Sequence, residues 1–111
     1  MGKNSKKDIF SFKNTKGAEY RIIFRKPNSA SYGEACDGYC EDPKDKDPKI
    51  VISPYLTKQS ELNTIVHEMA HAFFWDKPEA DIFAFANSVS RMLYNHCNWR
   101  KLENEKDRKR N

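Results

Sequence analysis

A helical spacing of apolar and polar positions runs through residues 62–74. Its apolar members are Leu62, Ile65, Val66, Met69 and Phe73. At about 100° per residue these side chains form one stripe, and His67 and His71 lie roughly opposite it. The pattern predicts an amphipathic helix that packs with one face and presents two imidazoles on the other. Thr57 or Ser60 is the expected N-cap of this helix.

A second helix is predicted from about Pro78 to about His96. The first helix must end near Trp75, because Pro78 follows shortly and a proline restricts the residue before it. The short connection between the two helices predicts that they pack as an antiparallel pair. One side of the second helix is apolar and carries Ile82, Phe85, Ala86, Val89, Met92 and Leu93.

Upstream of the helices, short apolar and aromatic runs have the character of β-strands. Residues 8–13 and 18–26 flank the turn sequence Asn14-Thr15-Lys16-Gly17 and predict a β-hairpin. Residues 39–41 are a candidate short strand. The β-branched segment 49–53 predicts a further strand, which leads through Pro54 into the first helix.

The first predicted helix contains the sequence His67-Glu68-Met69-Ala70-His71, which places two histidines one turn apart on a common face. Such a pair suits a catalytic zinc site, where three protein ligands leave a position for water. Glu68 follows the first histidine, so its carboxylate can reach that water without binding the metal. The pattern predicts Zn²⁺ as cofactor, with Glu68 as the general base that acts on metal-activated water. The alternative, a solvated face that carries two histidines by chance, is disfavoured by the amphipathic context.

A third ligand is expected near the start of the second helix, because the helix pair brings that end close to His71. Glu79, Asp81 and Asp76 are the candidates, and the helical wheel does not separate Glu79 from Asp81. Asp76-x-x-Glu79 also has the form of a capping box, in which Glu79 stabilises the helix without any metal. Asp81 could instead accept a hydrogen bond from a ligand histidine. The residues alone leave these alternatives open.

The length of 111 residues fits one domain. Hydrophobic residues make up 38% and charged residues 32%, so the chain is globular with a small core. No apolar run reaches the roughly 18–20 residues of a membrane span, and the Lys-rich start lacks the apolar segment of a signal peptide. Three cysteines, an odd number, fit a reducing compartment better than a disulfide framework. We therefore expect a cytoplasmic protein with no membrane partner.

The net charge of +4 is concentrated at the two ends of the chain. Residues 1–7 contribute +3 and residues 100–111 another +3, which leaves −2 for the middle. We therefore predict a disordered basic segment over residues 1–7, a folded domain over 8–99, and a charged, disordered tail over 100–111. A nucleic-acid platform on the folded body is disfavoured, and a monomer is favoured.

The surroundings of the two histidines resemble the small metallopeptidases of phages and prophages, a gluzincin-like family, and more distantly the peptidases that cleave prophage repressors. The similarity covers about residues 36–95 and is carried by His67-Glu68-Met69-Ala70-His71, Phe74-Trp75-Asp76 and Glu79-Ala80-Asp81-Ile82-Phe83-Ala84. The resemblance implies that His67, His71 and Glu79 bind zinc and that Glu68 is the base. It also implies an α+β, zincin-like fold, with a small antiparallel or mixed sheet packed on the active-site helix and a second, antiparallel helix.

Other residues of chemical interest have weaker patterns. Cys36 and Cys40 could join His96 and Cys97 in a second, structural zinc site. Their spacing matches no strong zinc pattern, and free buried cysteine is common. A tyrosine near the metal could stabilise an oxyanion, and the candidates are Tyr39, Tyr55 and Tyr94.

The leading hypothesis is a zinc metallopeptidase that hydrolyses peptide bonds of an intracellular protein. The alternative is a metal-stabilised adaptor of phage type with little catalytic activity. A weak nucleic-acid binder that uses the basic ends comes third, because those ends lack aromatic side chains for base stacking. Glu68 favours the first hypothesis over the second, since a structural site prefers four closed ligands and has no use for a base.

Overall fold

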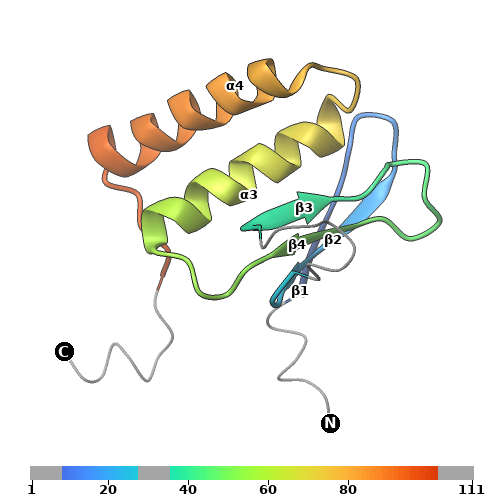
Figure 1. Cartoon of the computed structure of the whole chain (residues 1–111), viewed down its shortest axis with the longest axis horizontal. Coiled ribbons are helices and arrows are strands. Elements are labelled where there is room, and N and C mark those ends of the chain that lie inside the picture. The colour runs from blue at the N-terminus through green and yellow to red at the C-terminus, as the bar shows by residue number, and fades with distance from the viewer. Residues whose placement is uncertain (1–8, 28–35, 103–111) are drawn as a thin grey trace, which may run out of the picture.

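The computed structural model describes residues 9–27 and 36–102 as a sheet covered on one face by two stacked helices (Figure 1). Helix α3 (Lys58–Phe73) lies between the sheet and helix α4 (Glu79–Arg91), which packs on α3 and runs antiparallel to it. The predicted α+β class and the antiparallel helix pair are therefore confirmed. No helix of the described part has the length and apolar character needed to cross a bilayer. The predicted disordered residues 1–7 lie outside the described residues.

The sheet is mixed, with the strand order β1-β2-β4-β3. Strands β1 (Ile9–Lys13) and β2 (Glu19–Phe24) form the predicted antiparallel hairpin, whose turn contains Gly17 at a φ of 90°. Strand β4 (Lys49–Ile52) runs parallel to β2 and antiparallel to β3 (Gly38–Cys40). Strand β3 is consequently an edge strand of this sheet, next to α3.

The core lies between the sheet and α3. It consists of Tyr20, Ile22, Ile50, Ile52 and Ala72, with Ile65 and Met69 of α3 packed against it. The Tyr20 hydroxyl donates a hydrogen bond of 2.7 Å to the carbonyl of Glu41, which satisfies the one polar group of this buried side chain. Burial raises the pKa of Tyr20 well above its ordinary value. Ile65 and Met69 of the predicted apolar stripe thus pack against the core, whereas Leu62 lines a separate pocket and Phe73 is 38% exposed.

Both ends of α3 are fixed by side chains. The Thr57 hydroxyl is the N-cap and accepts a hydrogen bond from the Ser60 amide at 3.1 Å, which confirms one of the two expected caps. At the other end, Asn14 Nδ2 in the hairpin turn donates to the Ala72 carbonyl at 3.0 Å. Since the last carbonyls of a helix have no partner within it, this bond ties the histidine-bearing end of α3 to the sheet.

Gly38 brings strand β3 unusually close to α3. A Cβ atom at this position would meet the Val51 carbonyl oxygen at 2.7 Å and Thr64 Cγ2 at 2.9 Å. The Val51 oxygen is a backbone atom of β4, so it cannot move aside as the end of a flexible side chain could. Glycine is therefore required where the edge strand passes the helix that carries the histidines.

Helix α4 buries a narrower stripe than predicted. Ile82 and Ala86 are buried, but Phe85 is 48% exposed and Met92 is 53% exposed. Within the described part, α4 packs against α3 and not against the sheet, so α3 covers one side of α4 and part of the predicted apolar stripe faces outward. The helical segment ends at His96 as predicted, but its last turn, Met92–His96, is a π-helix.

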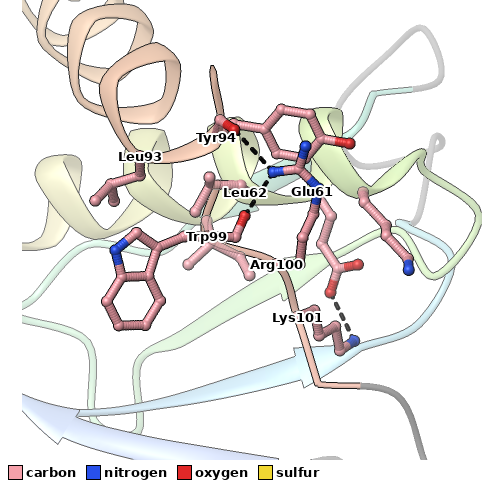
Figure 2. A pocket seen from close by; sticks show the side chains of 9 residues that line it. Glu61, Leu62, Leu93, Tyr94, Trp99, Arg100 and Lys101 are labelled. Carbon is pink, nitrogen blue, oxygen red and sulfur yellow. Dashed lines mark hydrogen bonds and ion pairs between the residues drawn. The ribbon is translucent and has the colours of Figure 1, made fainter. Parts of the chain in front are cut away.

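The segment after this π-helix differs from the predicted tail, since its first residues contact the folded body (Figure 2). Arg100 Nη1 donates to the carbonyls of Tyr94 and Trp99, at 2.8 and 2.9 Å, and the guanidinium lies 3.5 Å from the Tyr94 ring centre. Lys101 Nζ lies 2.8 Å from Glu61 Oε2. Together with apolar side chains, these residues line a pocket of about 230 Å³ at the end of the helix pair remote from Glu79. Residues 103–111 of the predicted tail lie outside the described residues.

Deleting residues 99–111 is expected to destabilise the protein more than deleting residues 103–111. Only the longer deletion removes the Arg100 and Lys101 contacts, which we expect to contribute about 1 kcal/mol, or about 4–8 °C in a domain of this size. Thermal unfolding of the full chain and the two truncated chains measures the difference. Equal melting temperatures for the two truncated chains would show that residues 99–102 add nothing to the stability of the fold.

Candidate metal centre

A tight connection brings the first residue of α4 back over the end of α3. The Phe74 amide donates to the Ala70 carbonyl at 2.8 Å and ends α3, and the Lys77 amide donates to the Phe74 carbonyl at 2.9 Å. Pro78, extended at φ −61° and ψ 148°, is the N-cap of α4. Glu79 therefore stands opposite the histidines in the C-terminal half of α3.

The side chains of His67, His71 and Glu79 form one group. Glu79 Oε2 lies 3.0 Å from His67 Nε2, and Glu79 Oε1 lies 3.0 Å from His71 Nε2. One potential ligand atom from each residue lies within 4.8 Å of the others, so the group could hold a metal ion. Donor atoms of a tetrahedral zinc site stand about 3.3 Å apart, given zinc–ligand distances of about 2.0–2.1 Å. The spacing and the donor types both fit zinc.

Of the three acidic candidates, Glu79 is the one that joins the histidines. Asp76 and Asp81 are exposed and do not belong to the group. The capping-box alternative is wrong, because the N-cap of α4 is Pro78 rather than Asp76 and no side chain caps the helix. Glu79 and Asp81 still stand in the first turn, where negative charge suits the helix dipole.

The environment of His71 favours its neutral, metal-binding form. Its side chain is 19% exposed, and burial lowers its pKa below the ordinary imidazole value. The nearby Glu79 carboxylate raises the pKa of His71 and the His67 ring lowers it further, and the net effect is a lowered pKa. A neutral imidazole offers the lone pair that a metal ligand needs.

Glu68 is buried beside this group but is not a member of it. Only 7% of the residue is exposed, and burial, with a further contribution from the Glu79 charge, raises the pKa of its carboxyl to about 7. Helix α3 packs on strand β3, and the Glu68 charge contributes, after burial, to raising the pKa of Cys40 in that strand to about 12. Glu68 thus interacts electrostatically with both Glu79 and Cys40, and its own pKa suits proton transfer near neutral pH.

Two aromatic residues next to the histidines were not predicted from the sequence. The ring centre of Phe83 lies 6.3 Å from that of His67, and the ring centre of Trp75 lies 6.4 Å from that of His71, both edge to face. Phe83 follows Glu79 by one turn of α4, so helical spacing would have identified it, whereas Trp75 lies in the turn after α3 and helical spacing does not place it. Both rings border the site.

None of the three tyrosine candidates is placed at the metal group. Tyr55 is 80% exposed and precedes α3, whereas Tyr94 packs under Arg100 at the far end of the helix pair. Tyr39 lies between Gly38 and Cys40, whose positions face α3. Because side chains alternate along a strand, Tyr39 occupies the opposite face of the sheet.

The second zinc site considered for the cysteines is not formed. Cys36 and Cys40 are half-buried and Cys97 is exposed, and all three are free thiols. Among the residues that the structure describes, these cysteines and His96 do not come together as potential ligands.

Comparisons of the chain with protein-family models, with curated proteins and with solved structures find no match.

Proposed function

We propose that this chain is a zinc-dependent metallopeptidase that hydrolyses peptide bonds of an intracellular protein. The observation that carries the proposal is the position of Glu68, a buried carboxyl beside the His67, His71 and Glu79 group but outside its ligand set. A structural metal site has no use for such a carboxyl, whereas hydrolysis requires a base. The resemblance to small phage metallopeptidases supports the same activity.

Each residue has a defined part in the proposed reaction. His67 and His71 would hold the ion through Nε2, and Glu79 through a carboxylate oxygen. The bound ion would supply a Lewis acid for the scissile carbonyl and a water whose pKa is lowered to about 7. Glu68 takes a proton from the attacking water and delivers it to the amide nitrogen as the peptide bond breaks. A neighbouring cation would favour the ionised form of Glu68 that begins this cycle.

The openness of the site supports catalysis rather than a structural role. The Glu79 side chain is 67% exposed, so a substrate can approach the group from the α4 side. Closed structural zinc sites surround the ion with four protein ligands, and three are grouped here.

Strand β3 offers a surface for an extended peptide beside Glu68. Its ladder to β4 uses the Asp37 carbonyl, which accepts from the Ser53 amide at 2.8 Å, and the Glu41 amide, which donates to Lys49 at 3.0 Å. By the alternation of an antiparallel ladder, the backbone groups of Gly38 and Cys40 point away from β4. An extended substrate can pair with those groups and place its scissile bond near the base.

We expect one zinc ion per chain in protein purified without added metal. The described residues offer one group of potential ligands, with two imidazoles and one carboxylate. Elemental analysis of the purified protein should give a zinc ratio near one. A ratio near two would require a second site, with the cysteines as the first candidates to test.

The activity itself is tested by a cleavage screen against denatured cell proteins, with the zinc-loaded wild type and the Glu68→Gln variant side by side. New peptide termini that appear with the wild type alone identify the substrates and the cleavage position. If both proteins yield the same termini, or neither yields any, the proposed activity is wrong.

A further inference from the structure

We propose that a polar pocket between the N-terminal half of α3 and the C-terminal half of α4 is a substrate subsite that binds a primary carboxamide, the side chain of a glutamine or asparagine. The lining of the carboxamide pocket, as we name it, includes Asp37, Asn63, Thr64, Asn87, Ser90 and Arg91. It has a volume of about 330 Å³. That the carboxamide belongs to a peptide substrate rests on the proposed function. Binding of a carboxamide in the pocket does not require hydrolysis.

The carboxamide pocket lies on the same face of the helix pair as the histidines. Asn63 stands one turn before His67 on α3, and Asn87 stands one turn after Phe83, whose ring borders His67. The distance between Asn63 and His67 along the helix axis is about 6 Å. An extended peptide covers that distance with about two residues. A side chain about two positions from the scissile bond would therefore reach the pocket.

A hydrogen-bonded network holds the pocket side chains in fixed orientations. Asn63 Nδ2 donates to Asn87 Oδ1 at 2.8 Å and to Ser90 Oγ at 3.0 Å. Ser90 is 2% exposed, and its hydroxyl is 3.4 Å from the Asn87 carbonyl, to which it donates. Both amide planes are thus set by bonds inside the protein, before any ligand binds.

This network leaves one acceptor and one donor for a ligand. The bonds use the nitrogen of Asn63 and the oxygen of Asn87, so Asn63 Oδ1 and Asn87 Nδ2 remain, with no hydrogen bond to another described residue. Exchanging the oxygen and nitrogen of both amides gives the same result, one remaining donor and one remaining acceptor, on two side chains that line the pocket. The complementary group carries an acceptor and a donor on the same side, as a primary carboxamide does.

Other common groups fit this pair less well. A carboxylate has acceptors alone, so it would pair with the pocket donor and leave the pocket acceptor without a partner. An ammonium group has donors alone and would leave the pocket donor without a partner. An apolar side chain would leave both pocket groups unpaired. A backbone amide has one donor and one acceptor, but a trans peptide directs them to opposite sides. The charges of Asp37 and Arg91, which both line the pocket, cancel and favour a neutral ligand.

Side-chain amide NMR spectra of the full-length, zinc-loaded protein test the pocket directly. The probes are the N-acetyl methylamides of glutamine, glutamate and leucine, which differ in the side-chain group alone. We expect the glutamine probe to shift the Asn63 and Asn87 amide signals with a dissociation constant about tenfold lower than those of the other two. Equal affinities, or no shift of these signals with any probe, overturn the proposal.

The substrate role is tested by cleavage of a peptide library by the wild type, Asn87→Asp and Asn95→Asp. Asn87→Asp keeps the acceptor for Asn63 but turns the free donor into an acceptor, so the preference should move from glutamine to lysine or arginine. Asn95 is exposed on the π-helix and makes the matched control, which should keep the wild-type preference. Cleavage without any preference for glutamine or asparagine, or with the same preference in Asn87→Asp, overturns the subsite while the peptidase stands. If no peptide is cleaved but the glutamine probe binds as expected, the peptidase is wrong and the carboxamide pocket stands as a binding site.

Discussion

Glu79→Gln is expected to lower the zinc affinity of the protein by more than about a hundredfold, since loss of even an outer hydrogen-bond partner of a metal ligand costs about 10- to 100-fold. The two Glu79 oxygens lie 3.0 Å from the two histidine nitrogens, where a carboxylate can bind the same ion. A neutral amide keeps the shape of the side chain but removes the anionic donor. Competition with a chelator of known affinity measures the change.

Asp81→Asn is the matched control for this prediction. Asp81 stands in the same first turn of α4 and carries the same charge, but it is exposed and lies outside the ligand group. Its replacement should change the helix-dipole interaction by the same small amount and leave the zinc affinity within a few fold. A larger loss of affinity for Asp81→Asn than for Glu79→Gln would move the third ligand to Asp81.

The elements that local sequence specifies were predicted close to their observed bounds. The hairpin follows from apolar runs on either side of Asn14–Gly17, and β4 follows from a β-branched segment. The end of α3 near Trp75 follows from Pro78. Each of these features depends on side chains within a few residues, so a pattern along the chain contains the necessary information.

The choice of the third ligand depends on a turn that the helical wheel does not describe. Glu79 and Asp81 flank the apolar stripe at similar angles, so periodicity treats them alike. The structure distinguishes them because α4 begins at Glu79, with Pro78 rather than Asp76 as its N-cap. That start places the first residue of α4, and not the third, against the histidines. The position of the first residue of α4 decides which acidic side chain reaches the histidines, and sequence patterns locate the ends of helices less well than their interiors.

Long-range packing explains the other differences. Phe85 and Met92 share a stripe with buried residues, but they are exposed because, among the residues that the structure describes, α3 is the one helix that covers α4. Arg100 and Lys101 have the composition of a tail, yet they follow Asn98, whose φ is 58°, and contact the folded body, Arg100 at Tyr94 and Lys101 at Glu61 of α3. Neither outcome depends on neighbouring residues, so neither can be obtained from spacing alone.

Glu68→Gln is expected to keep the zinc ion and to lower the rate of peptide hydrolysis by about 10²- to 10⁴-fold, the range that general base catalysis contributes. Glu68 is not in the ligand group, so the substitution removes the base and no donor to the metal. Gln has nearly the shape of the protonated carboxyl, which fits a site where burial already raises the pKa of Glu68 to about 7. Initial rates on a substrate from the cleavage screen, with zinc content measured on the same samples, separate the two effects.

Stability measurements on the same pair exclude a trivial loss of folding. Burial favours the neutral form of Glu68 in the folded chain and raises its pKa to about 7. Between the ordinary glutamate pKa and about pH 7, the free energy of unfolding of the metal-free protein therefore falls as the pH rises. Glutamine cannot ionise, and the metal-free variant should therefore be at least as stable as the metal-free wild type at neutral pH. A variant that is fully folded, binds zinc and still cleaves a confirmed substrate at the wild-type rate would exclude Glu68 as the base, because no other part of the mechanism depends on its proton.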